Sequence, residues 1–233
     1  MKQSNPSSHS LVSVIVVVRN GERFLTQALS SILQGSYRSV EILVIDGSSS
    51  DRTLEIAHSF EHVRCLPQKG EGIAAAYNTG VEAAAGEYVA FLSHDDLWTP
   101  DKLETQIGFM NSKPEVEYTI ARAKFFLEPG HEIPRGFRRE LLEGDHVAPI
   151  METLVARRRL FESLGTFDTS LAIANDVDWF TRASDQKIPT AVLPQVLLHK
   201  RVHDTNLSMN IDTNNRDLLK LLKASIDRKR QAA

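Results

Sequence analysis

The chain of 233 residues has a single cysteine, Cys65, and only 7% aromatic residues. One cysteine cannot form an intrachain disulfide, so the sequence does not require an oxidising compartment. The longest apolar run near the N-terminus, residues 14–18, is far shorter than the roughly 20 residues that cross a bilayer. The first ten residues are polar and lack the apolar stretch of a secretion signal. We therefore expect a cytoplasmic protein whose membrane contact would be peripheral, at the inner face of the membrane.

The sequence also lacks a large excess of charge of either sign. Lys and Arg number 27 and Asp and Glu number 30, which gives a net charge of −3. Nucleic-acid-binding domains are usually clearly basic, so we expect no nucleic-acid partner. The motifs G-x-G-x-x-G, G-x-x-x-x-G-K-[ST] and G-x-S-x-G are absent, and no cysteine spacing indicates a metal site. A dinucleotide-binding fingerprint, a P-loop and a serine nucleophile elbow therefore have no support.

The sequence does contain an alternation of predicted strands and helices in its first half. Continuous β-branched runs indicate buried strands, and apolar residues at helical spacing indicate helices. The predicted strands are residues 11–18, 40–45, 63–66 and 88–92, and the predicted helices are residues 22–33, 52–60 and 73–85. This order predicts an α/β fold with a parallel, doubly wound sheet. Ligands of such sheets bind beyond the carboxyl ends of the strands.

The pattern changes after residue 100. The predicted elements are helices at 103–110, 154–164 and 176–183, a strand at 118–126, and a strand at 192–202 broken by Pro194. With 42% hydrophobic residues and no long linker, the chain can bury one large core. We predict a flexible segment at 1–10, one domain at 11–215 whose halves meet near residue 112 and share a sheet, and an amphipathic helix at 216–233.

The C-terminal helix has two possible roles. Its predicted apolar face consists of Leu218, Leu219, Leu222 and Ile226. That face would either pack on the core or, because basic residues flank it, lie on an anionic membrane or contact a partner.

Two adjacent carboxylates, Asp95 and Asp96, follow the strand predicted at 88–92. Such neighbours repel each other unless a positive charge is near. A hard cation with oxygen ligands, Mg²⁺ or Mn²⁺, would relieve the repulsion and could also hold the phosphates of a nucleotide. Capping of the next segment is the structural alternative, and the pair alone does not separate the two.

Three more residues are candidates for chemistry. Asp46 ends a predicted strand, where a carboxylate can accept a hydrogen bond from a ribose or a base. Asp176 lies in a short acidic stretch and could take a proton from an acceptor hydroxyl. His203 could join Asp96 as a second metal ligand if the fold brings them together. A turn, a helix cap or a structural hydrogen bond is the alternative for each.

Seven ordered segments together resemble glycosyltransferase family 2, the inverting transferases with the GT-A fold. They include Val-Ile-Asp-Gly-Ser-Ser-Ser-Asp-Arg-Thr at 44–53, Ala-Gly-Glu-Tyr at 85–88 and Phe-Leu-Ser-His-Asp-Asp at 91–96. The segments are residues 13–21, 41–53, 72–88, 91–96, 158–168, 175–176 and 203–208. The resemblance therefore covers nearly the whole chain.

The resemblance implies a Rossmann-like nucleotide-binding half and an acceptor half on a mixed central sheet. It implies transfer of a sugar, with inversion, from a nucleotide-sugar donor to an unidentified glycan, lipid-linked sugar or peptide, as in polysaccharide biosynthesis. A UDP-sugar is expected from family frequency, with Mg²⁺ or Mn²⁺ as cofactor. Asp176 would be the base, and Asp96 would bind the metal, with His203 as a second ligand. The predicted nucleotide-binding residues are Val18, Asn20, Asp46, Lys69 and Asp95.

The sequence departs from the family's pattern at three places. Residues 17–19 replace a Pro-Thr-Tyr, Ser93 replaces the first Asp of the metal motif, and Asn175 replaces the Glu before the base. Two other classes therefore stay open, a catalytically inactive GT-A-fold subunit that binds nucleotide or a partner, and a nucleotidyltransferase. The loop after the first strand has too few glycine and basic residues for the phosphate loop of a nucleotidyltransferase, which disfavours that class.

Overall fold

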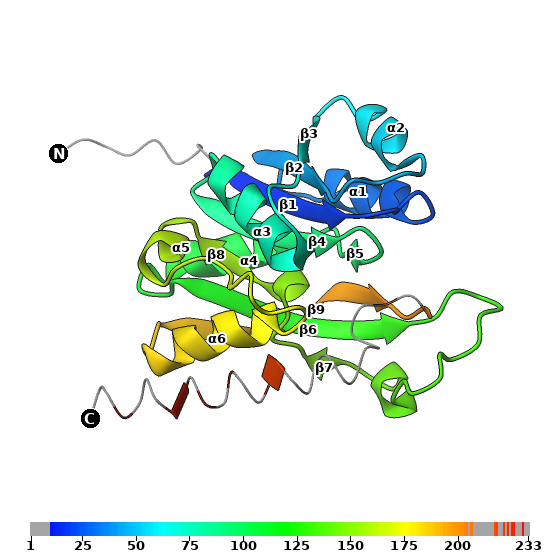
Figure 1. The fold of residues 1–233 in the computed structure, drawn as a ribbon. Helices are drawn as coiled ribbons and strands as arrows, with labels where there is room; N and C mark the ends of the chain where they lie inside the picture. The colour runs from blue at the N-terminus through cyan, green and yellow to red at the C-terminus, as the bar shows by residue number, and fades with distance from the viewer. Residues whose placement is uncertain are drawn as a thin grey trace.

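Figure 1 shows the fold of the chain in a computed structural model. The described residues are 10–204, 206, 217, 218, 221, 223, 225, 226 and 230. The predicted segment at 1–10 therefore lies, apart from Ser10, outside the described residues. Within the described part of the chain, no helix is long and apolar enough to cross a membrane.

The first half of the chain alternates strands and helices as the sequence predicts. Its elements are β1 (Val12–Val18), α1 (Leu25–Leu33), β2 (Val40–Asp46), α2 (Thr53–His58), β3 (Val63–Pro67), α3 (Gly72–Ala83) and β4 (Tyr88–Ser93). Strand β1 pairs in parallel with β2 and β4, and β2 pairs in parallel with β3. The carboxyl ends of these strands therefore lie along one edge of the sheet.

The second half extends the same sheet with strands of mixed direction. Its elements are β5 (Leu97–Trp98), α4 (Lys102–Ser112), β6 (Tyr118–Phe126), η1 (Arg139–Leu142), β7 (His146–Val147), η2 (Met151–Thr153), β8 (Val155–Arg157), α5 (Arg159–Ser163), α6 (Asn175–Asp185) and β9 (Thr190–Arg201). The strand order is β3-β2-β1-β4-β8-β6-β9-β5, with β7 beside β6. Antiparallel pairing of β4 with β8 joins the halves, so the predicted shared sheet is confirmed.

Two predicted elements were wrong in detail. The helix predicted at 154–164 is the short strand β8 followed by the short helix α5, because Val155 and Ala156 pair between β4 and β6. The break predicted at Pro194 is a register shift inside a continuous β9, where Val192 and Val196 face Ile120 and Arg122. A proline is tolerated at such an irregularity because no ladder hydrogen bond is required there.

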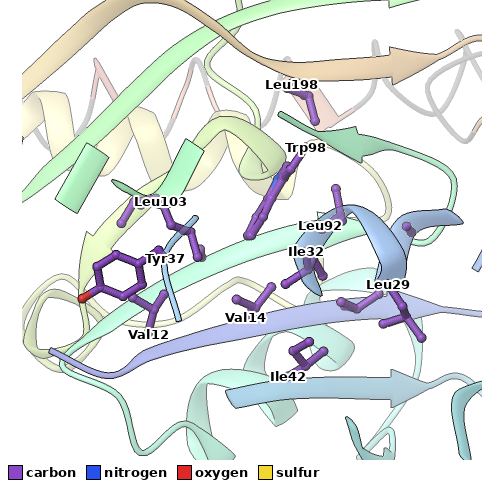
Figure 2. Packing of buried hydrophobic residues seen from close by; sticks show 14 of the residues in the cluster. Val12, Val14, Leu29, Ile32, Tyr37, Ile42, Leu92, Trp98, Leu103 and Leu198 are labelled. Carbon is purple, nitrogen blue, oxygen red and sulfur yellow. The ribbon is translucent and has the colours of Figure 1, made fainter. Parts of the chain in front are cut away.

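The core lies on both faces of the sheet because successive side chains of a strand point to opposite sides. Alternate residues of β1, such as Val14 and Val16, pack with α1, α2 and α4, while Ile15 and Val17 pack with α3, α5 and α6. Figure 2 shows the first cluster, with Trp98 between Leu198 of β9 and the side chains of β1. Burial of these side chains fixes the strand ends that carry the polar residues.

The C-terminal stretch contacts the acceptor half through residues that differ from the predicted face. Its described residues between 217 and 230 are helical, and Leu221 packs with Leu171 and Ala174. Leu218 and Ile226 are 37% and 43% exposed, so these two residues of the predicted apolar face point outward. Leu219 and Leu222, the other two, lie outside the described residues.

Candidate functional site

The loops after β1 and β2 form one hydrogen-bonded unit at the carboxyl edge of the sheet. The amide of Asn20 donates to Ser49 Oγ at 2.8 Å, and the amide of Ser50 donates to Asn20 Oδ1 at 2.9 Å. The amide of Ser49 donates to the buried carboxylate of Asp46 at 3.1 Å. The Val18 carbonyl accepts a hydrogen bond from the amide of Gly47 at 2.8 Å. Three of the predicted nucleotide-binding residues therefore lie together, namely Val18, Asn20 and Asp46.

Lys69 follows β3 at the same edge of the sheet, where the amide of the preceding Gln68 donates to the Asp46 carbonyl at 2.9 Å. Its ammonium pairs with Glu82 of α3 at 2.9 Å, and both side chains are more than 60% exposed. Its backbone amide donates to Thr79 Oγ1. The ammonium is therefore held on the outer side of α3 by a surface ion pair, which contributes little stability.

Asp95 lies beside His203, far away in the sequence. Asp95 Oδ2 is 2.8 Å from His203 Nε2 and 3.2 Å from Asn206 Nδ2. Burial alone would raise the pKa of Asp95, but the hydrogen bond from His203 and the charge of Lys200 hold it well below its usual range. Asp95 is therefore an anion, and the two hydrogen bonds of its carboxylate among the described residues fall on one oxygen.

Asp96 is fully buried and has both oxygens engaged. Lys200 Nζ lies 2.7 Å from Oδ2, and the backbone amide of Arg201 donates to Oδ1 at 2.9 Å. Burial raises the pKa of Asp96 to about 7, since the opposing charge of Lys200 is offset by those of Asp95 and Glu152. Asp96 therefore connects the segment after β4 to the end of β9, through its hydrogen bonds with Lys200 and Arg201.

Arg201 fixes the loop that carries Asp95. Its Nε donates to the Asp95 carbonyl at 2.7 Å, and its guanidinium lies over the ring of Phe24, 4.4 Å from the centroid. The end of β9 and the segment after it thus supply three residues that contact Asp95 or Asp96, namely Lys200, Arg201 and His203. Sequence analysis had placed only His203 among them, since the other two lay within a predicted strand.

Glu152 is a further carboxylate of the site that the sequence did not indicate. It lies in the short helix η2, is 7% exposed, and accepts a hydrogen bond from Ser93 Oγ at the end of β4. Its Oε1 is 3.7 Å from Lys200 Nζ. No sequence motif indicates Glu152. Only the folded path of the chain between β7 and β8 places η2 beside the end of β4.

Asp176 is the second residue of α6 and is half-buried. The amide of Val177 donates to its Oδ1 at 2.7 Å. Burial raises the pKa of Asp176 to about 6, with Glu152 adding to the shift while the Val177 amide and Lys200 oppose it. The carboxyl group therefore shares an electrostatic environment with the residues at the ends of β4 and β9.

The contacts of Arg182 hold α6 in place. Arg182 pairs with Asp178 at 2.8 Å, and its Nη atoms donate to the carbonyls of Leu164 and Thr166 at 2.7 Å.

The side chain of Asn175, at the start of α6, is buried without a hydrogen bond to any described residue. The residue is 1% exposed, and neither polar atom of its side chain has a partner in the described structure. Buried amides are normally hydrogen-bonded, so a water molecule or a ligand group would be needed to satisfy it.

A divalent cation fits Asp95 and His203 better than it fits Asp96. The described residues contain no group of three His, Cys, Asp or Glu side chains that could hold a metal by themselves. An oxygen and an imidazole nitrogen 2.8 Å apart, sharing one proton, can instead share a cation that takes its other ligands from a diphosphate. Asp96 offers no such oxygen because Lys200 and Arg201 already occupy both.

Comparison with known proteins gives one consistent result. The model of glycosyl transferase family 2 matches residues 13–173. An uncharacterized glycosyltransferase of Rickettsia typhi is 32% identical over 233 residues, which cover 90% of this chain and 70% of that protein. The family match includes the ends of β1, β2 and β4, whereas Asp176, Lys200 and His203 lie beyond it.

Solved structures share the fold at low sequence identity. TarS of S. aureus (residues 1–349) has a TM-score of 0.70 at 19% identity, covering 93% of this chain and 64% of TarS. Related TarS structures contain UDP or UDP-GlcNAc. The mannosyltransferase PcManGT of Pyrobaculum calidifontis, in complex with GDP-Man and Mn²⁺, has a TM-score of 0.71 at 23% identity, covering 96% of this chain and 66% of PcManGT. This chain thus spans about two thirds of both proteins. Its matched family and its mixed sheet agree, and the chain belongs to glycosyl transferase family 2 with the GT-A fold.

Proposed function

We propose that this domain transfers a sugar, with inversion, from a nucleoside-diphosphate sugar to a hydroxyl group of an acceptor. The observation that carries the proposal is the contact of Asp95 with His203 at 2.8 Å beside the buried pair of Asp96 and Lys200, whose charge also acts on Asp176. A cation site and a base at one edge of the sheet are the two devices that the reaction needs.

The donor side of the proposal rests on the first two loops. Asp46 and Asn20 present a buried carboxylate and an amide beside the ends of β1 and β2, suited to the hydroxyl and amide groups of a nucleoside. UDP, UDP-GlcNAc and GDP-Man are bound by the proteins of similar fold, which supports a nucleotide-sugar donor. A UDP-sugar is the first donor that we would test. Lys69 would contact the donor only after its ammonium leaves Glu82.

On the acceptor side, Asp176 would take the proton from the attacking hydroxyl. A carboxyl group with a pKa of about 6 is deprotonated at neutral pH and still basic enough to help. The hydroxyl oxygen forms a bond to C1 of the sugar while the bond from C1 to the diphosphate breaks on the opposite side. A divalent cation held by Asp95 and His203 would stabilise the charge that develops on the departing diphosphate. The acceptor is proposed by its chemistry, a hydroxyl of a glycan, lipid-linked sugar or peptide.

The first experiment is thermal unfolding of the purified protein with UDP, GDP and their sugar derivatives, each with and without Mn²⁺. A ligand that binds only the folded state raises the unfolding midpoint by mass action. We expect one nucleotide to raise the midpoint, and to do so far more strongly with Mn²⁺. If no nucleotide changes the midpoint with either Mn²⁺ or Mg²⁺, the donor site is lost and the transferase proposal is contradicted.

Two matched variants separate the roles of the adjacent carboxylates. Asp95→Ala should abolish the Mn²⁺-dependent part of the nucleotide effect, because it removes half of the proposed cation pair. Asp96→Asn should keep that effect while it lowers the free energy of unfolding by about 3 kcal/mol, because it breaks a buried ion pair with Lys200. The reverse outcome would assign the cation to Asp96, as the sequence first suggested.

A further inference from the structure

Arg201 is the last residue of β9 and is only 1% exposed, although its side chain is charged. Its guanidinium lies over two aromatic rings, with Cζ 4.4 Å from the ring centroid of Phe24 and 4.8 Å from that of Phe126. Phe24 precedes α1 in the first half of the chain, and Phe126 ends β6 in the second half. Such stacking suits the planar guanidinium of arginine better than the compact ammonium of lysine. The side chain is therefore held where the two halves of the chain meet.

The same guanidinium joins three segments by polar contacts. Its Nε donates to the Asp95 carbonyl, in the loop after β4, at 2.7 Å. Its Nη2 donates to Gln27 Oε1 on α1 at 2.6 Å, and its Nη1 pairs with the carboxylate of Glu128 after β6. Because the N–H groups of an arginine form a rigid fork, one side chain fixes these segments relative to one another.

The chain after Arg201 carries one member of the proposed cation pair. The backbone amide of Arg201 donates to Asp96 Oδ1 at 2.9 Å, so residues 95 and 96 are both bound to Arg201. His203 follows two residues later, and its Nε2 lies 2.8 Å from Asp95 Oδ2. The ring of Phe24, which packs on Arg201, also lies 5.2 Å from the His203 ring, centroid to centroid. The separation of Asp95 and His203 therefore depends on how Arg201 is held.

Arg201 does not serve to neutralise the carboxylates of the site. Among the contacts of the described residues, its side chain donates to the Asp95 carbonyl and not to the carboxylate of Asp95 or Asp96. Those carboxylates have His203 and Lys200 as their own partners. A bond to the carbonyl fixes the position of the loop, and this is the function that the contact can perform.

We propose that Arg201 is a positioning residue for the cation site. It binds the backbone of Asp95 to the strand that leads into His203, so that carboxylate and imidazole keep a separation that one divalent cation can bridge. The inference rests on the proposed function and adds to it a residue that contacts neither the cation nor the nucleotide. Loss of the contact should weaken binding of the cation while both of its proposed ligands remain.

The test measures the Mn²⁺ concentration that gives half-maximal binding of UDP, or of GDP if that nucleotide binds better. In Arg201→Lys the charge remains, but the fork and the stacking are lost. The required Mn²⁺ concentration should rise about tenfold or more, since groups that orient metal ligands change metal affinity by about 10- to 100-fold. Nucleotide affinity without a divalent cation should stay the same.

Arg182→Lys is the matched control. Arg182 is also a largely buried arginine whose fork holds a carboxylate and two backbone carbonyls, but it acts on α6. Its replacement should lower the midpoint of thermal unfolding, as that of Arg201 should, and leave the Mn²⁺ requirement of nucleotide binding unchanged. An equal rise in both variants would make Arg201 a structural residue and overturn the assignment.

A second variant keeps the inference testable if Arg201→Lys does not fold. Gln27→Ala removes one partner of Arg201 at an exposed position of α1, so it should fold and show a smaller rise in the Mn²⁺ requirement. An unchanged requirement in the Arg201 variant, or in Gln27→Ala if only that variant folds, would overturn the assignment. A wild type that binds no nucleotide with any cation contradicts the proposed function itself, which is a separate result.

Discussion

Asp176 shows how burial can prepare a carboxyl group for proton transfer. The side chain lies at the start of α6, where partial burial and the nearby charge of Glu152 both disfavour its anion. Its pKa of about 6 is closer to neutral pH than that of an exposed aspartate. A general base works best when its pKa lies near the working pH, so this residue is suited to its proposed role.

Replacement of Asp176 by Asn should leave donor binding intact and reduce transfer by roughly 100-fold or more, since a general base contributes about that much. In the wild type, protonation of the base at low pH should reduce kcat. The rate should therefore fall about tenfold per pH unit below pH 6 and level off above it. Initial rates between pH 4.5 and 8 test the pH dependence, and nucleotide affinity of Asp176→Asn serves as the control. A variant with undiminished transfer would exclude Asp176 as the base.

Helix α3 shows at the scale of an element why one glycine matters and another does not. A Cβ atom at Gly80 would lie 2.4 Å from Cγ2 of Ile15, a fully buried residue of β1. At Gly108 of α4 nothing lies within 4 Å of the same atom. Both positions are helical, so an alanine at either has the same intrinsic advantage of about 1 kcal/mol. Only the packing of the helix against the sheet distinguishes them.

Gly80→Ala should lower the free energy of unfolding by about 1–3 kcal/mol, because overpacking against β1 outweighs the better helix propensity. Gly108→Ala should leave it unchanged or raise it by up to about 1 kcal/mol. Denaturant unfolding of the two variants beside the wild type gives both numbers. Equal effects at the two sites would mean that α3 does not lie as close to β1 as the structure has it.

At the scale of the whole molecule, the C-terminal stretch is tied to the loop that leads into the proposed base. The carboxylate of Asp217 accepts hydrogen bonds from the amides of Ala172 and Ile173 at 2.8 and 3.0 Å, and Ser225 donates to Asp185 at the far end of α6. Leu221 packs with Leu171 and Ala174, which lie on either side of the two amides that Asp217 binds. The stretch therefore supports α6 from outside, which favours its packing on the domain.

Loss of this support should affect catalysis more than donor binding. We expect Asp217→Ala to lower the free energy of unfolding by about 1–2 kcal/mol and to reduce kcat, because two amides before α6 lose a charged partner. The affinity for nucleotide, whose proposed site lies at the ends of β1 and β2, should not change. Lys223→Ala, an exposed position of the same stretch, is the control. A weaker nucleotide affinity with unchanged kcat would contradict this connection.

The sequence by itself determined the first half of the fold and many of the residues of the proposed site. The β-branched run of β1 and the helical spacing of α1 and α3 predict their elements because burial on one or both faces leaves a local pattern. The strand-end rule then selected Asp46 and Asp95 at one edge, since parallel strands bring their carboxyl ends together. These features depend on residues close to one another along the chain.

Only the tertiary structure decided which charges meet. Neither Glu152 nor Lys200 carries a local sequence signal, because Glu152 lies in the short helix η2 and Lys200 in a strand whose pattern is ordinary. Antiparallel pairing of β5 with β9 brings Lys200 to Asp96 and His203 to Asp95, across more than a hundred residues of sequence. Electrostatic interactions act through space rather than along the chain, so the partner of each carboxylate became known only once the sheet was assembled.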